Sequence, residues 1–87
     1  MNKQEIISLA ESLGFVLDND KYDDKTYSGE SNNLRYLRFV SAESGLDEKD
    51  LRWIWYKEDS DEDNLNRGRY IKSRLDKKKV VINSLKY

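Results

Sequence analysis

The chain has 87 residues, with 16 lysines and arginines against 17 aspartates and glutamates, so its formal net charge is −1. This length allows one domain, residues 1–87, with one small core, and excludes a second domain. Cysteine and histidine are absent, which excludes disulfides, thiolate metal sites and the commonest general base of enzymes.

The first predicted element is a helix over residues 2–13. Apolar residues recur there along one helix face, at Ile6, Leu9, Ala10 and Leu13. Gly14 follows the last of them, at the position where a left-handed residue ends many helices. The apolar residues 15–17 then predict a short strand.

Two runs rich in aromatic and β-branched residues, 34–40 and 51–57, predict neighbouring strands of one sheet. The polar segment 18–33 is long for a loop in a small domain, so we expect an edge strand at 25–28. The connector 41–50 holds four acids and one glycine. It is too long for a tight hairpin, and we expect a helical turn in it.

A second helix is predicted over 61–76, because Ser60 offers a capping hydroxyl and three acids follow at the positive end of the helix dipole. Gly68 lowers the stability of this helix by about 1 kcal/mol relative to alanine. Its buried side is predicted to hold Leu65, Ile71 and Leu75. The apolar run 80–82 predicts a last strand. The expected fold is α+β, in the order α-β-β-β-α(-β), with an antiparallel sheet packed against helices.

Strand alternation places Leu51, Trp53 and Trp55 on one sheet face, and Ile54 and Tyr56 on the other. Two helices can cover one face of such a sheet, so large aromatic side chains are expected to stay accessible. The alternative is that helices flank both faces, or that the aromatic rings only roof the sheet edges. If one face is open, it is a candidate protein-binding surface. The residues predicted to form it are Tyr36, Trp53 and Trp55.

Charge is arranged in blocks: residues 1–33 carry a net −4, residues 43–63 a net −6 and residues 67–79 a net +6. Acids at the start of a helix and bases at its end are favoured by the helix dipole alone, so the blocks do not by themselves require a partner. As a recognition surface, the acidic block would attract a basic protein. Its candidate binding residues are Asp59, Asp61, Glu62 and Asp63.

The basic block supports an alternative function, because it would line a phosphate backbone. Segment 35–40 also resembles the basic-aromatic strand of an RNA-recognition motif, although the glycines of that motif are missing. The candidate nucleic-acid-binding residues are Arg67, Arg69, Arg74, Lys77, Lys78 and Lys79.

Metal and catalytic sites are not expected. Segments 18–22 and 59–63 begin like calcium-binding loops, but Asp23 and Asn64 stand where the turn glycine belongs. No set of side chains suggests a nucleophile with its base, so we expect no cofactor and no enzyme activity. No apolar run approaches the roughly 20 residues that cross a bilayer, so we expect a cytoplasmic protein without a membrane partner.

The leading hypothesis is a small non-catalytic module that binds a protein partner and occludes a basic, nucleic-acid-facing surface of a host enzyme. In size and acidity the chain is similar to phage-encoded inhibitors of bacterial defence nucleases, including anti-CRISPR and anti-restriction proteins. That resemblance implies an acidic surface that acts as a DNA mimic. The alternatives are a nucleic-acid-binding domain that uses residues 67–79, and a self-associating subunit that completes its sheet with a second copy.

Overall fold

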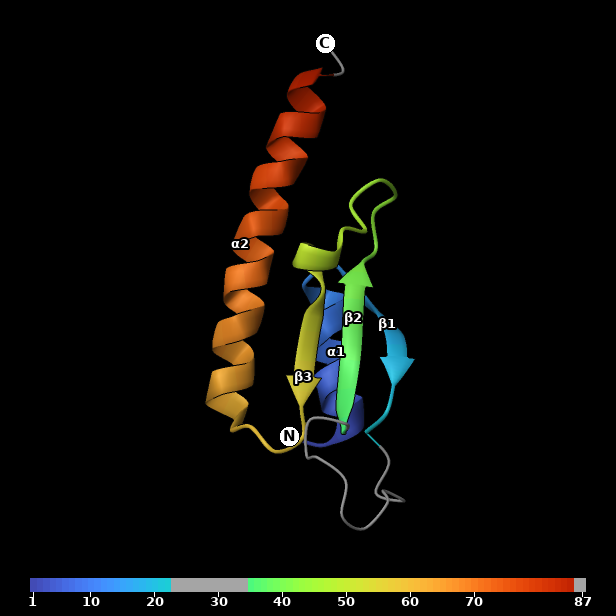
Figure 1. Ribbon diagram of the computed structural model, residues 1–87, viewed down its shortest axis with the longest axis vertical. Coiled ribbons are helices and arrows are strands. Elements are labelled where there is room, and N and C mark those ends of the chain that lie inside the picture. The colour runs from blue at the N-terminus through green and yellow to red at the C-terminus, as the bar shows by residue number, and fades with distance from the viewer. Residues whose placement is uncertain (23–34, 86–87) are drawn as a thin grey trace.

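The computed structural model describes residues 1–22 and 35–85, and the strand predicted at 25–28 lies outside them. The described elements are two helices, three strands and one 3-10 turn (Figure 1). The strands form an antiparallel sheet in the order β1-β2-β3, which confirms the α+β class. In chain order the elements are α1 (Lys3–Ser12), β1 (Phe15–Asp20), β2 (Tyr36–Ser41), η2 (Lys49–Leu51), β3 (Trp53–Tyr56) and α2 (Asp61–Leu85).

Helix α1 begins and ends as its sequence predicts. Asn2 caps it, because its side-chain oxygen accepts a hydrogen bond from the Glu5 amide at 2.8 Å. The Glu5 carboxylate accepts one from the Asn2 amide at 3.1 Å, which completes a capping box. At the other end Gly14 has a φ of 91°, in the left-handed region where a side chain would be strained.

A bulge in β1 changes which residues of that strand face the helices. Leu17 lies opposite Phe39, and Asn19 lies opposite Arg38, so Asp18 is the extra residue. After the bulge Asp20 lies opposite the buried Leu37 and forms an ion pair with Lys3 of α1. The bulge therefore ties the far end of β1 to the first helix.

The core lies between one face of the sheet and the two helices. Burial alternates along β2 and β3 as predicted, but the side chains of Trp53 and Trp55 are 0% and 1% exposed. The expectation that these tryptophans stay accessible is therefore wrong. Their face of the sheet is the one that the helices cover. The core consists of Ile6, Ala10, Phe15, Leu37, Phe39, Leu46, Leu51, Trp53, Trp55, Ile71 and Leu75.

Four aromatic rings pack against one another within the core, among its aliphatic side chains. The Trp53 ring lies 5.6 Å from Phe15 in an edge-on arrangement and 5.7 Å from Phe39, between ring centroids. Its Nε1 donates a hydrogen bond to the backbone oxygen of Asn64 at 3.0 Å, so no polar atom of the indole is left unpaired in the core. Gly68 of α2 leaves space for this ring.

Helix α2 lies along the outer edge of β3 and pairs with it through side chains. The Asn64 side chain accepts a hydrogen bond from the Tyr56 amide at 3.0 Å and donates one to the Tyr56 carbonyl at 2.9 Å. Arg67 donates to the Ile54 carbonyl at 2.9 Å. These bonds satisfy backbone groups that an edge strand normally exposes.

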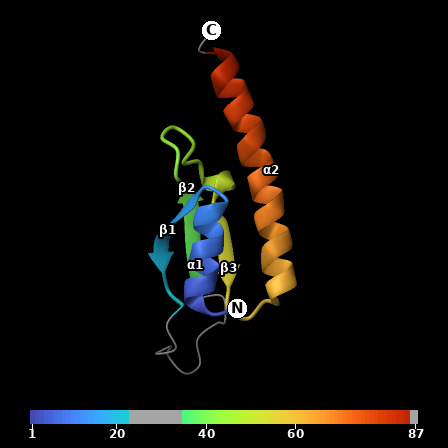
Figure 2. The ribbon, with the colours of Figure 1, turned by 180° about the vertical axis from the view of Figure 1, so that it is seen from behind.

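Helix α2 is longer than predicted, since it continues to Leu85 and contains residues 80–82. The strand predicted there is wrong. Residues 77–85 contain no glycine or proline to stop the helix, and α2 itself occupies the edge of β3 where another strand would pair. The end of α2 extends well beyond the sheet, as both views show (Figures 1 and 2).

Candidate protein-binding surface

The outer face of the sheet carries no described helix. Figure 1 views the strands from this side. Figure 2 views the opposite side of the sheet, where α1 lies in front of the strands. Val16 is 41% exposed there, and the other outward side chains are half-buried by their neighbours. The expectation that two helices cover one face is therefore confirmed. The outer face displays Val16, Tyr36, Arg38, Val40, Ile54 and Tyr56.

Two tyrosines form an aromatic pair at one end of this face. Tyr36 of β2 lies directly opposite Tyr56 of β3, with ring centroids 6.3 Å apart. The Lys21 ammonium lies 6.0 Å from the centroid of the Tyr36 ring, and the Arg67 guanidinium lies 5.1 Å from that of Tyr56. Such cation–π contacts hold the rings in place. Of the three aromatic residues predicted to form the binding surface, Tyr36 lies on the outer face, and Trp53 and Trp55 lie in the core. Tyr56 is the second aromatic residue of the outer face.

Arginine–carboxylate pairs surround the tyrosines and balance the charge of the outer face. The Arg38 side chain donates to Asp18 at 2.7 Å, and Arg35 forms an ion pair with Glu58. Exposed pairs of this kind contribute only about 0–1 kcal/mol to stability. These pairs therefore offset part of the charge on the outer face.

The acidic turn, residues 58–63, includes the connection from β3 to α2 and the first residues of α2, so it adjoins the end of the outer face where β3 ends (Figure 1). The Ser60 hydroxyl caps α2, as predicted, since it accepts a hydrogen bond from the Asp63 amide at 3.1 Å. Three acids of this turn have ion-pair partners. Glu58 pairs with Arg35, and Asp59 contacts Arg67 at 2.8 Å. Asp61 contacts the N-terminal amine of Met1, also at 2.8 Å.

Glu62 and Asp63 are exposed, and their carboxylates have no partner among residues 1–22 and 35–81. The hydrogen bond that the Met1 amine donates to the Asp61 carboxylate raises the pKa of that amine. Of the four predicted acids, Glu62 and Asp63 therefore offer free carboxylates to a partner.

Most of the predicted phosphate-binding bases are held by acids within the molecule. Arg67 pairs with Asp59 and Arg74 pairs with Asp50. Lys78 and Lys79 reach Glu48 and Glu43 at 3.2 Å and 2.9 Å. These pairs connect α2 to the acidic residues 43–59. The positive block thus neutralises much of the negative block.

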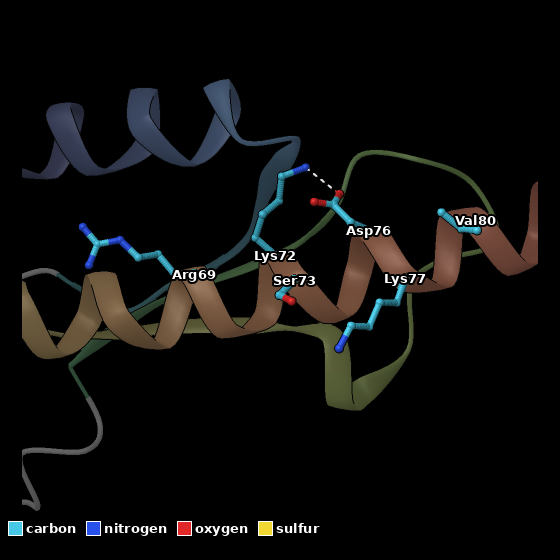
Figure 3. Close-up of a pocket in the computed structure, with 6 residues that line it drawn as sticks. All are labelled: Arg69, Lys72, Ser73, Asp76, Lys77 and Val80. Carbon is cyan, nitrogen blue, oxygen red and sulfur yellow. Dashed lines mark hydrogen bonds and ion pairs between the residues drawn. The ribbon is translucent and has the colours of Figure 1, made fainter.

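Arg69 and Lys77 differ from the other bases of α2. The Arg69 guanidinium donates to the Asn66 side chain at 2.7 Å, and in the described part of the chain neither base contacts an acid. Figure 3 shows both beside a shallow groove along α2, where Lys72 binds Asp76 at 2.9 Å. A groove formed by one exposed helix face does not enclose a substrate.

The described residues hold no group of three or more acids placed to bind a metal ion. Within the same ranges, no helix is both long enough and apolar enough to span a membrane. Comparisons with protein-family models, curated proteins and solved structures find no match to the chain. The exposed surface itself is therefore the basis for a functional proposal.

The remaining edge of the sheet bears on self-association. Strand β1 has no strand neighbour on its outer side within the described sheet. It carries the bulge at Asp18 and the acids Asp18 and Asp20, features by which edge strands avoid pairing with another chain. Completion of the sheet by a second copy is therefore disfavoured at β1, and α2 occupies the edge at β3.

Proposed function

We propose that the protein is a non-catalytic protein-binding module that contacts its partner with the outer face of its sheet. The observation that carries this proposal is the Tyr36–Tyr56 pair, which lies on a face that no described helix covers. Tyrosine is enriched at binding hot spots, because it brings a large, rigid contact area at a low cost in side-chain entropy. Val40 and Ile54 extend the apolar contact beside the two rings.

The chemistry of the partner follows from the acidic turn at the end of this face. The carboxylates of Glu62 and Asp63 are exposed in the first turn of α2, a few residues after Tyr56, and would attract a basic surface, chiefly by raising the rate of association. In this proposal the partner is an enzyme that handles nucleic acid in the cytoplasm. The acids stand in for phosphates and occlude its cationic surface, as an anti-restriction or anti-CRISPR inhibitor from a phage would.

Nucleic-acid binding by α2 is the second candidate, and the observation that favours it is the pair of free bases, Arg69 and Lys77. Affinity for a phosphate backbone grows with the number of phosphates neutralised. Four of the six predicted bases already hold carboxylates of the same molecule, so this surface offers few charges to a polyanion.

The test is affinity capture from the cell of origin with three versions of the protein. The wild type and a Tyr70→Ser control, altered at an exposed tyrosine of α2, are expected to retain the same partner. The double variant Tyr36→Ser/Tyr56→Ser is expected to lose it while keeping its circular dichroism spectrum. Equal retention of the partner by a folded double variant would overturn the proposed surface.

A second variant tests the acidic turn. Glu62→Gln/Asp63→Asn removes two free carboxylates without changing the shape of the side chains. It is expected to slow association with the captured partner about tenfold in low salt and to have little effect in high salt. An association rate that is unchanged in low salt contradicts the role of these acids as phosphate mimics.

A further inference from the structure

The exposed apolar side chains of the described residues are concentrated on α2. Five large apolar side chains are exposed in the described part of the chain, and three of them belong to α2: Tyr70 at 62%, Val80 at 65% and Val81 at 55%. They lie on the side away from the sheet, since the core side of α2 holds Ile71 and Leu75. Neither overall view shows another element on that side (Figures 1 and 2).

Tyr70 and Val80 belong to a continuous stripe, which we call the outer stripe of α2. Its members recur at alternating steps of three and four residues, the spacing that keeps side chains on one helix face and aligns them with a second helix. All six of its residues are exposed. The outer stripe consists of Asp63, Asn66, Tyr70, Ser73, Lys77 and Val80.

The charges of the outer stripe are arranged symmetrically about its tyrosine. Asp63 lies seven residues before Tyr70, and Lys77 lies seven residues after it, which is two helical turns in each direction. Within the described chain neither charged side chain has an ionic partner. The stripe is therefore complementary to an antiparallel copy of itself. A parallel copy would place like charges together.

We propose that a second copy of this chain binds along the outer stripe, with the two α2 helices antiparallel. The twofold axis passes beside Tyr70, so that the two tyrosine rings meet and Asp63 of each copy faces Lys77 of the other. The projecting end of each α2 carries Val80 and Val81 past the start of the other α2. This contact leaves the outer face of the sheet free. It shares Asp63 with the proposed contact to a protein partner, so in the dimer Glu62 and the Tyr36–Tyr56 pair remain available to that partner.

The composition of the stripe also sets the strength of the dimer. Asp63 and Lys77 are separated by about 21 Å along the helix, and few apolar groups lie between them. The buried area falls at the low end for specific interfaces, below about 1,200 Å² in total. The dimer is therefore expected to be weak, to form at micromolar or higher protein concentration, and to dissociate as salt screens the two ion pairs.

Sedimentation equilibrium of the whole chain over a range of concentrations tests the proposal. The wild type is expected to dimerise in low salt, and Lys77→Glu is expected to raise the dissociation constant at least about tenfold, because it places like charges at both ends of the interface. Lys49→Glu is the matched control, since it makes the same charge change at an exposed residue of η2 off the stripe. It is expected to dimerise like the wild type.

Mixing two variants tests the antiparallel arrangement. Asp63→Lys and Lys77→Glu are each expected to be monomeric alone, yet to form a heterodimer when mixed, because every charged position then meets its opposite. A wild type that is monomeric throughout the series overturns the proposal. So does a Lys77→Glu variant that dimerises as tightly as the Lys49→Glu control, or a mixture that fails to associate.

Discussion

Gly68 of α2 lies directly against the indole ring of Trp53. A Cβ atom built on this glycine would come within 3.0 Å of three atoms of the ring. The ring cannot move aside easily, because it is buried among Phe15 and Phe39 and its Nε1 donates a hydrogen bond to Asn64. The residue that disfavours the helix by intrinsic propensity is therefore the one that lets the helix approach the sheet.

Replacement of Gly68 is expected to destabilise the protein although it improves helix propensity. Gly68→Ala gains about 1 kcal/mol of propensity but overpacks the Trp53 site, for a net loss of about 1–2 kcal/mol in the free energy of unfolding. Urea denaturation measures this loss. Ser73→Ala, at an exposed position of the same helix, is the control and is expected to be neutral or slightly stabilising. A Gly68→Ala variant as stable as the wild type contradicts the close contact.

The buried side chain of Asn64 is expected to be necessary for the attachment of α2 to β3. Asn64→Leu leaves the amide and carbonyl of Tyr56 without their partners, which should cost about 2–4 kcal/mol. The exposed Asn66→Leu is the matched control, with an expected effect below about 0.5 kcal/mol. Thermal or urea unfolding distinguishes them, and equal stability of the two variants would show that the bonds to Tyr56 are unimportant.

The ion pair between Asp20 and Lys3 is expected to make stability depend on acid pH. Desolvation tends to raise the pKa of Asp20, but hydrogen bonds from the Lys3 side chain and the Tyr22 amide outweigh it, so the pKa lies below its ordinary value of 3.8. Because the folded pKa is the lower one, the stabilisation is complete above 3.8 and is lost as the pH falls through the folded value.

The corresponding measurement compares wild type with Asp20→Asn by urea unfolding across this pH range. The variant is expected to be less stable at neutral pH, and the difference should close in strong acid, where the wild-type carboxyl is protonated. Glu11→Gln, at an exposed carboxylate of α1, serves as the control and is expected to show a much smaller pH-dependent difference. A wild-type advantage over Asp20→Asn that stays constant down to strong acid would rule out the ion pair as its source.

Local sequence patterns predicted much of the fold. The apolar spacing around Ile6 and Ala10 located α1, and Ser60 with the acids after it located the start of α2. Alternation along 51–57 separated Trp53 and Trp55 from Ile54 and Tyr56, because a strand places successive side chains on opposite faces whatever packs on it. These features depend on residues that are close together in the sequence.

The errors concern contacts between distant parts of the chain. Periodicity could not tell which face of β3 the helices cover, and that choice decides whether tryptophan or tyrosine is accessible. The complementary contact of Gly68 with Trp53 joins residues 15 positions apart and has no local signal. Nor did the sequence show that the Asn64 side chain would bind the edge of β3. Because α2 occupies this edge, a strand at 80–82 cannot pair there.

The most direct test of the binding surface is hydroxyl-radical footprinting of the complex with the captured partner, with labelling of each tyrosine compared between the free and bound protein. If the partner binds the outer face of the sheet, we expect strong protection of Tyr36 and Tyr56 on binding and unchanged labelling of Tyr70 on α2. Protection of Tyr70 with undiminished labelling of Tyr36 and Tyr56 would contradict the proposed surface and place the partner on α2 instead.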